Sequence, residues 1–322
     1  MSATELATAD LPSGEPIPSS GPPAPAPSPK PLPPLRDLFA AAPSNADAFL
    51  AHLQRCLQTP SGIDTTLLLV CYASRLSASV LEALTRPAIR RSADRLLAIA
   101  ASLPPSATLV FTAKALPGGG VAAILGVAKR LRALSALLSD ARTFLRLWGL
   151  LNMYFWARRL VLGSRKEEEG KDKEDKVERA ISWVQMSTCV VFQALENGAY
   201  LSSKGVLGWS ASAQRRAGLW SARFWAAFVG VEVGRLFYES HRRGRRSREE
   251  KFAGGKSAAQ VQRDEIEWAD AWKKSVARNL AWAPLTVHWS VEQGMLGEMA
   301  VGALATIPGV IQMRDLWRRT AE

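Results

Sequence analysis

A helical pattern of apolar residues from 129 to 159 constrains this chain more than any other feature. On a helix of 3.6 residues per turn, one narrow strip is polar, and it contains Arg132, Ser135, Ser139, Arg142, Thr143 and Arg146. Most of the remaining circumference is apolar, with Leu131, Leu134, Leu137, Leu138, Phe144, Leu145, Trp148 and Leu151. This arc is wider than the stripe of roughly 100° that a one-sided core contact needs. We therefore expect an amphipathic helix that lies at a membrane surface.

Two interpretations of this helix compete. Most amphipathic helices are surface helices of globular domains, and the helical wheel alone favours that interpretation. The polar strip, however, holds three arginines with only Asp140 nearby as an acid, whereas a solvated face usually mixes both signs. Leucine and tryptophan opposite arginine fit the boundary between acyl chains and anionic headgroups. The membrane-binding residues predicted on this basis are Arg132, Leu138, Arg142, Leu145, Arg146 and Trp148.

Charge and tryptophan are unevenly placed along the chain. The net charge is +12, so we expect an anionic partner, either a phospholipid surface or a nucleic acid. Residues 44–162 hold 14 Lys and Arg against 5 Asp and Glu, and all 11 tryptophans lie at Trp148 or later. Tryptophan favours membrane–water interfaces, although a large aromatic core would explain its placement equally well. The basic residues share a helix with Leu and Trp and no nucleic-acid-binding motif occurs, so we expect no nucleic-acid partner.

Composition divides the chain into four parts. Residues 1–43 contain 12 of the 19 prolines and are predicted to be disordered and partly polyproline II. Residues 44–162 form an N-terminal helical region, 163–179 a charged linker, and 180–322 a C-terminal membrane-embedded helical region. Patterns of period 3.6 dominate and no stretch alternates cleanly with period 2. The predicted fold is therefore all-α, a membrane-associated bundle or set of hairpins with an amphipathic interfacial helix.

Capping residues set the expected helix starts in the N-terminal region. Asn45 can cap a helix that reaches about Gln58, and Asp64 can cap a second helix that continues through Leu84. Pro87 fits the first turn of a third helix, because a proline needs no amide donor there.

Three apolar patches could enter a bilayer, at residues 180–201, 219–238 and 285–311. None provides about 20 uninterrupted apolar residues, and the second carries Arg223, Glu232 and Arg235. Gly230 and Gly234 form a pair of small residues four apart, which permits close helix packing. We expect an integral membrane protein whose exact spans the pattern does not define.

The sequence contains no catalytic constellation. His52, His241 and His288 are too few and too scattered for a metal site. The glycines at 118–120 lack the following Lys-Ser/Thr that a phosphate-binding loop needs. We therefore expect no catalytic, metal-binding or cofactor-binding residue, no cofactor, and a protein that is not an enzyme.

Four blocks occur in order between about Ala46 and Trp317: residues 61–67 with 71–72, 139–142 with 145–150, 196–201 with 204–207, and 283–290 with 292–294. They resemble the N-terminal helical, amphipathic and central regions of the peroxisomal biogenesis factor 11 family, and the C-terminal region of its fungal C-type members. The resemblance implies an integral protein of the peroxisomal membrane that elongates the membrane ahead of fission and promotes peroxisome proliferation. It also implies a homo-oligomer that cooperates with the fission machinery.

The resemblance further implies that an amphipathic helix remodels the membrane, with matching positions at Leu138, Arg142, Leu145, Arg146 and Trp148. Arg90, Arg91 and Arg95 on the preceding helix are a second candidate. A helix inserted shallowly into one leaflet adds area to that leaflet only, and the mismatch favours positive curvature. Hydrophobic burial would drive insertion, and each arginine near an anionic surface would add about 1 kcal/mol.

Two other functions stay open. A pore or metabolite channel of the same membrane is suggested by Glu196, Glu292 and Glu298 in apolar patches, since intramembrane acids are often functional. A channel should show a polar stripe through several true spans, and the pattern shows no clean set of spans. A soluble helical adaptor that recruits partners through its proline-rich tail is the third possibility. Carbonate extraction separates it from the others, because a soluble adaptor should leave the membrane pellet.

Overall fold

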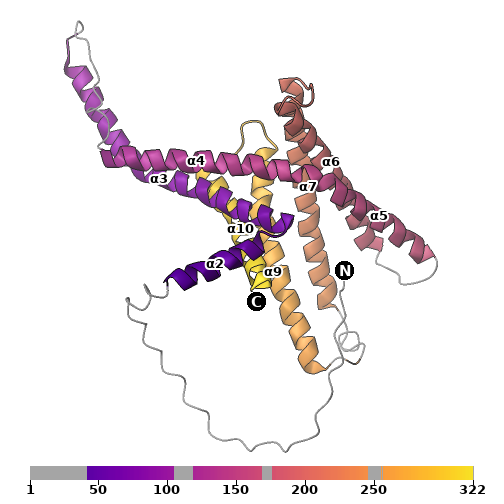
Figure 1. Cartoon of the computed structure of the whole chain (residues 1–322). Coiled ribbons are helices and arrows are strands. Elements are labelled where there is room, and N and C mark those ends of the chain that lie inside the picture. Colours follow the sequence, from indigo (N-terminus) through magenta and orange to yellow (C-terminus); the bar gives the residue numbers. More distant parts are fainter. Residues whose placement is uncertain (1–41, 105–118, 169–175, 246–254, 256, 322) are drawn as a thin grey trace, which may run out of the picture. The chain divides into compact units, whose positions relative to one another are not determined.

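The computed structural model describes residues 42–104, 119–168, 176–245, 255 and 257–321. All regular structure within these residues is helical and none of them lies in a strand, which confirms the all-α prediction. The predicted disordered tail lies almost wholly outside the described residues. The chain separates into two units, Met1–Ala48 and Phe49–Glu322, and the second contains nearly all of the described helices (Figure 1).

Long helices make up the second unit and pack largely as neighbouring pairs. In chain order the described helices are α2 (Ala42–Cys56), α3 (Pro60–Ser102), α4 (Gly119–Leu145), the 3-10 turn η2 (Arg146–Trp148), α5 (Gly149–Glu168), α6 (Lys176–Ser203), α7 (Ala211–Gly244), α9 (Ala258–Trp289) and α10 (Glu298–Thr320). Helix α3 packs against α4 and α10, α7 packs against α6 and α9, and α9 also contacts α10. The N-terminal and C-terminal helical regions therefore share one packed unit.

One helix replaces two of those predicted. We expected separate helices starting near Asp64 and Pro87, but α3 begins at Pro60 and runs unbroken to its end at Ser102. The Thr59 hydroxyl caps it by accepting a 3.0 Å hydrogen bond from a first-turn amide. Pro87 lies inside the helix, so one carbonyl loses its donor. Ending the helix at Pro87 would instead leave several backbone amide and carbonyl groups at the new helix ends without hydrogen bonds, which would cost more free energy.

The predicted charged linker is helical at both ends. Helix α5 extends to Glu168 and α6 begins at Lys176, so both helices reach into residues 163–179. The intervening residues 169–175 lie outside the described part of the chain.

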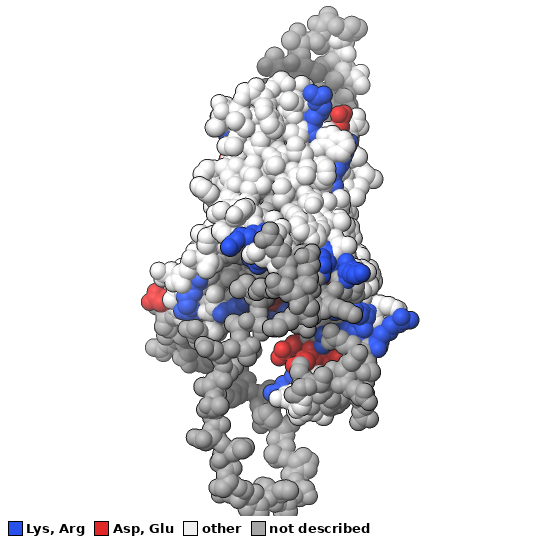
Figure 2. All heavy atoms as spheres, turned by 90° about the vertical axis from the view of Figure 1, so that its right-hand side faces the viewer, with Lys and Arg blue, Asp and Glu red and all other residues white. Residues whose placement is uncertain are grey.

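Many side chains in this unit show the opposite of the burial that is usual in a water-soluble protein, because polar ones are buried and large apolar ones are exposed. Buried positions include Arg142, Gln185, Gln193, Asn197 and Asn279. Large apolar side chains are exposed on most helices, among them Val70, Leu84, Leu97, Leu137, Trp148, Tyr154, Trp220, Phe237 and Leu280. On the side where α5, α6 and α7 lie, the upper part of the surface carries few charged groups, and charges gather lower down (Figure 2). Exposed apolar area around a partly polar interior is typical of helices that pack within lipid.

Among the described helices, α3 alone is long and apolar enough to cross a membrane. This criterion uses length and composition only, and the core helix of a soluble protein also meets it. The three apolar patches predicted from the sequence fall in α6, in α7 and across α9 and α10. The membrane-spanning candidate therefore differs from all three.

Small residues let α10 approach α3 closely. A Cβ atom on Gly302 would lie 2.9 Å from the Cα atom of Leu76, and one on Gly309 would lie 3.1 Å from the α3 backbone two turns away. Gly230 and Gly234 of α7 instead have no atom within 4 Å of the corresponding position. Among the described residues no helix packs closely at that pair, because the spacing permits a contact and does not supply a neighbour.

We predict that replacing glycine by alanine has opposite effects on stability at a glycine packed against another helix and at a glycine with no neighbour. Gly302→Ala should lower the free energy of unfolding by about 1–3 kcal/mol, because its methyl group meets the α3 backbone. Gly230→Ala should raise it by about 0.5–1 kcal/mol, because alanine favours the helix and meets nothing. Unfolding of the full chain in mild detergent, followed by circular dichroism, measures both. Equal shifts for the two variants would contradict the α3–α10 contact.

Candidate membrane-binding surface

The predicted amphipathic helix is interrupted near its middle. Helix α4 ends at Leu145, η2 covers the next turn, and α5 begins at Gly149. Two buried amides of α6 contact this interruption: the side chain of Asn197 donates to the Leu147 carbonyl at 3.1 Å, and Gln193 donates to Asn197 at 2.6 Å. A Cβ atom on Gly149 would lie 2.9 Å from the Gln193 side chain, so this position needs glycine unless Gln193 moves.

Most of the polar strip of α4 and η2 faces other helices, whereas Ser139 is exposed. Arg142 is only 9% exposed, and its guanidinium contacts the Asp64 carboxylate of α3 at 2.8 Å. Arg146 contacts the Glu196 carboxylate of α6 at 2.8 Å through two hydrogen bonds. Ser135 on the same strip is buried against α3. These contacts fix which side of α4 turns inward.

Arg132 joins three helices at the other end of the strip. Its guanidinium contacts Glu82 of α3 at 2.6 Å and Glu298 of α10 at 3.0 Å. Glu298 also accepts two hydrogen bonds of 2.8 Å from Arg75. These bonds, together with the charges of Arg75 and Arg132, hold the pKa of Glu298 below its ordinary value. Glu298 is therefore charged at neutral pH and links α10 to both α3 and α4.

The opposite side of α4, η2 and α5 is apolar and exposed. Leu137 is 65% exposed and Trp148 is 70% exposed. We define the outer apolar face as Leu134, Leu137, Phe144, Trp148, Leu151 and Phe155, all of which are exposed. No partner helix covers these side chains among the described residues. Continuous exposed apolar area of this kind marks a site for another molecule or for a membrane.

The six predicted residues therefore lie in different surroundings. Trp148 is on the outer apolar face, and Leu138 and Leu145 are half-buried. Arg132, Arg142 and Arg146 lie in ion pairs between helices, so they do not point outward as contact with headgroups requires. A helical wheel shows which residues share a strip, but it does not show that acids from α3 and α6 oppose them. The membrane-binding role of these six residues stays a prediction.

Four basic residues were missed by the sequence analysis. Lys129, Arg130, Arg158 and Arg159 are exposed, and none forms an ion pair with a described residue. They flank the outer apolar face along the chain, which is the signal that could have identified them. The second candidate set, Arg90, Arg91 and Arg95, is exposed on α3.

Two of the three histidines form hydrogen bonds that hold local structure, and His241 is exposed near the end of α7. His52 lies 3.0 Å from the Thr320 hydroxyl, and His288 accepts hydrogen bonds from the amides of Met295 and Leu296 in the turn before α10. Within the described part of the chain, no group of three or more His, Cys, Asp or Glu residues is placed to hold a metal ion.

We predict that the Arg142–Asp64 pair stabilises the fold through both partners together. Arg142→Leu should lower the free energy of unfolding by about 2–4 kcal/mol, because it leaves a partly buried carboxylate unpaired. Adding Asp64→Leu should recover most of that loss, since no charge then remains. The control Arg130→Leu, on an exposed arginine of the same helix, should stay within about 0.5 kcal/mol. If the double variant is no more stable than Arg142→Leu alone, the pairing is not what stabilises this contact.

Comparison with known proteins identifies the family. The family model of peroxisomal biogenesis factor 11 (PEX11) matches residues 122–317, which is more than half of the chain. The match includes three of the four blocks recognised in the sequence, and the block at residues 61–72 precedes it. An uncharacterized protein of Schizosaccharomyces pombe is 26% identical over 184 residues, 57% of this chain and 74% of that protein. No solved structure matches significantly.

Proteins of this family are peroxisomal and act in peroxisome proliferation and membrane elongation. The comparisons identify the family without distinguishing a branch of it. The ordered blocks, the all-α fold and the family match agree, and the chain belongs to the peroxisomal biogenesis factor 11 family.

Proposed function

We propose that this chain elongates the peroxisomal membrane ahead of fission by inserting the outer apolar face of α4, η2 and α5 into one leaflet. The observation that carries the proposal is the orientation of α4. Arg132 and Arg142 of α4 and Arg146 of η2 are paired with carboxylates of neighbouring helices. Leu134, Leu137 and Phe144 of α4 are exposed. A surface helix of a water-soluble domain would have the reverse orientation. This exposure also argues against the soluble adaptor.

Hydrophobic burial would supply most of the insertion energy. Burying one large apolar side chain is worth about 1.5–3 kcal/mol, so the six residues of the outer apolar face supply on the order of 10 kcal/mol. The helix rests on a packed bundle, so little conformational entropy is lost when it inserts. A rigidly held helix that inserts into one leaflet acts as a wedge, because it expands that leaflet alone and so favours positive curvature.

Attraction to anionic lipid would come from residues other than the paired arginines. Lys129 and Arg130 precede the outer apolar face, and Arg158 and Arg159 follow it. Each exposed cation near an anionic surface contributes about 1 kcal/mol, and salt screens this contribution. Arg142 and Arg146 would position the helix through their carboxylate partners.

Homo-oligomerisation and cooperation with the fission machinery belong to the same proposal. Several copies inserted side by side would each enlarge the same leaflet, so the area difference between the two leaflets would be larger than one copy can produce. Both ideas rest on family membership, and the fold contributes only the rigid mounting of the wedge.

A reconstitution experiment tests the insertion. The full chain should convert vesicles containing anionic phospholipid into tubules, as seen by electron microscopy. Leu137→Ser with Trp148→Ser should abolish tubules and weaken vesicle binding by about 3–5 kcal/mol, because two large apolar side chains are lost from the face.

The matched control places the same change elsewhere. Val206→Ser with Met295→Ser removes two equally exposed apolar side chains from turns outside α4, η2 and α5, and tubules should persist. Tubules of normal number with the Leu137/Trp148 double variant would refute insertion through this face.

A further inference from the structure

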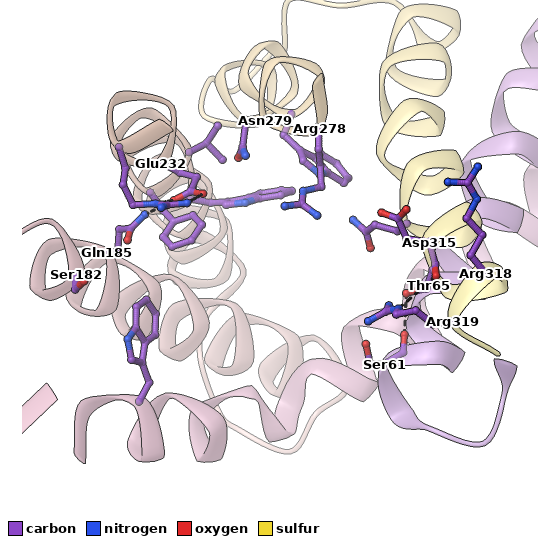
Figure 3. Close-up of a pocket in the computed structure, with 17 residues that line it drawn as sticks. Ser61, Thr65, Ser182, Gln185, Glu232, Arg278, Asn279, Asp315, Arg318 and Arg319 are labelled. Atoms are coloured by element: carbon purple, nitrogen blue, oxygen red, sulfur yellow. Dashed lines mark hydrogen bonds and ion pairs between the residues drawn. The ribbon is translucent and has the colours of Figure 1, made fainter. Parts of the chain in front are cut away.

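A cavity of about 1060 Å³ lies between the helices, away from the outer apolar face. Side chains from α5, α6, α7, α9, α10 and the start of α3 line it (Figure 3). Part of the wall is aromatic, with Trp156, Trp225, Phe228 and Trp282. None of the six residues that define the outer apolar face contributes to it. The cavity therefore has two kinds of surface, one aromatic and one charged.

Both acids of the cavity are already paired. Glu232 accepts hydrogen bonds of 2.7 and 2.8 Å from Arg235 and one of 2.6 Å from Gln185. Asp315 lies 2.7 Å from the ammonium group of Lys274. Each carboxylate thus has a hydrogen-bonded or ion-paired partner other than Arg278 and Arg319, although the charge of Arg278 also acts on Glu232.

Two arginines of the lining, Arg278 of α9 and Arg319 of α10, are not hydrogen-bonded to a carboxylate of the described residues. The lining contains Arg235, Arg278, Arg318 and Arg319 against the two acids, so four positive charges face two negative charges and the excess is +2. Arg278 has only a 3.5 Å contact with Ser275, and Arg319 donates only to the Asp315 main-chain carbonyl at 3.3 Å. Neither forms an ion pair with a described residue. In Figure 3 the side chains of Arg278 and Arg319 extend from α9 and α10 into the space between the helices.

We propose that this cavity binds an amphiphile that carries a phosphate monoester, with its phosphate between Arg278 and Arg319 and its apolar part against the aromatic part of the lining. A phosphate monoester carries a charge of about −1.5 to −2 at neutral pH, which matches the excess of +2. The planar guanidinium fork suits phosphate oxygens because it can donate two parallel hydrogen bonds. The volume slightly exceeds the usual range for small-molecule pockets and accommodates a headgroup with part of an acyl chain.

The phosphate could belong to a lipid headgroup or to a soluble molecule, and a binding experiment distinguishes these sources. The full chain in non-ionic detergent is titrated with dioctanoyl phosphatidic acid, with inorganic phosphate, and with dioctanoyl phosphatidylcholine, and heat or tryptophan fluorescence is recorded. Saturable binding of phosphatidic acid that phosphate does not displace assigns a lipid. Displacement by phosphate at similar concentration assigns a soluble phosphate ligand. Both outcomes support a phosphate site, and equal binding of phosphatidylcholine would overturn it.

Two variants show whether binding occurs in this cavity. Arg278→Gln with Arg319→Gln should weaken binding at least tenfold, and Arg319→Gln alone should weaken it measurably, although this exposed side chain contributes little to the fold. The control Arg263→Gln with Arg314→Gln removes one exposed arginine from each of the same two helices outside the cavity, and should bind normally. Helicity by circular dichroism verifies that all variants are folded. Unchanged affinity in the folded Arg278/Arg319 double variant would refute the site. Membrane tubulation is not part of this readout, so failure here leaves the insertion proposal unaffected.

Discussion

Arginine–carboxylate pairs between helices determine the orientation on which the rest of this structure depends. Arg142 meets Asp64 of α3, Arg146 meets Glu196 of α6, and Arg132 bridges to α3 and α10. A guanidinium taken from water is costly unless a carboxylate receives it with good geometry, so each pair requires both partners in place. Together the pairs fix the rotation of α4 about its own axis. The leucines and aromatic residues of the outer apolar face then have no interior position left.

Contacts of several kinds hold helices together in a lipid environment. Lipid tails are as apolar as leucine, so helices in a membrane associate through close packing, hydrogen bonds and paired charges. This chain shows each of these contacts. Gly302 and Gly309 bring α10 onto α3, buried Gln193 and Asn197 bind the 3-10 turn, and the arginines connect α4 to its neighbours. Membrane insertion through the outer apolar face follows from this arrangement as our proposal.

Much of the fold follows from the sequence, whereas the direction of its faces does not. Period 3.6 predicts helices throughout, and the ordered blocks identify the family before any contact is known. Spacing alone decides which residues share a side, and Arg132, Ser135, Arg142 and Arg146 of the predicted strip do contact neighbouring helices. Whether Arg142 turns toward water or toward Asp64 depends on a residue 78 positions away in the chain, which no local pattern contains. Pro87 and Gly230 also show that a local pattern does not contain the information on distant neighbours. A proline signals a possible helix start and a glycine pair a possible contact, but the neighbouring helices decide both outcomes.

The central claim is that the outer apolar face lies in lipid while the polar strip faces the other helices. Spin labelling tests this claim directly. A nitroxide spin label is attached to cysteines introduced one at a time from residue 134 to 144 of the full chain in anionic vesicles, with Cys189 replaced by alanine. Collision with oxygen, which concentrates in lipid, should peak at Leu137 and Phe144 and fall to a minimum at Ser135 and Arg142, with a period near 3.6 residues. Collision with a water-soluble nickel complex should be low at all of these positions. A peak of the nickel signal at Leu137 and Phe144 would show that this face lies in water, and it would contradict the account.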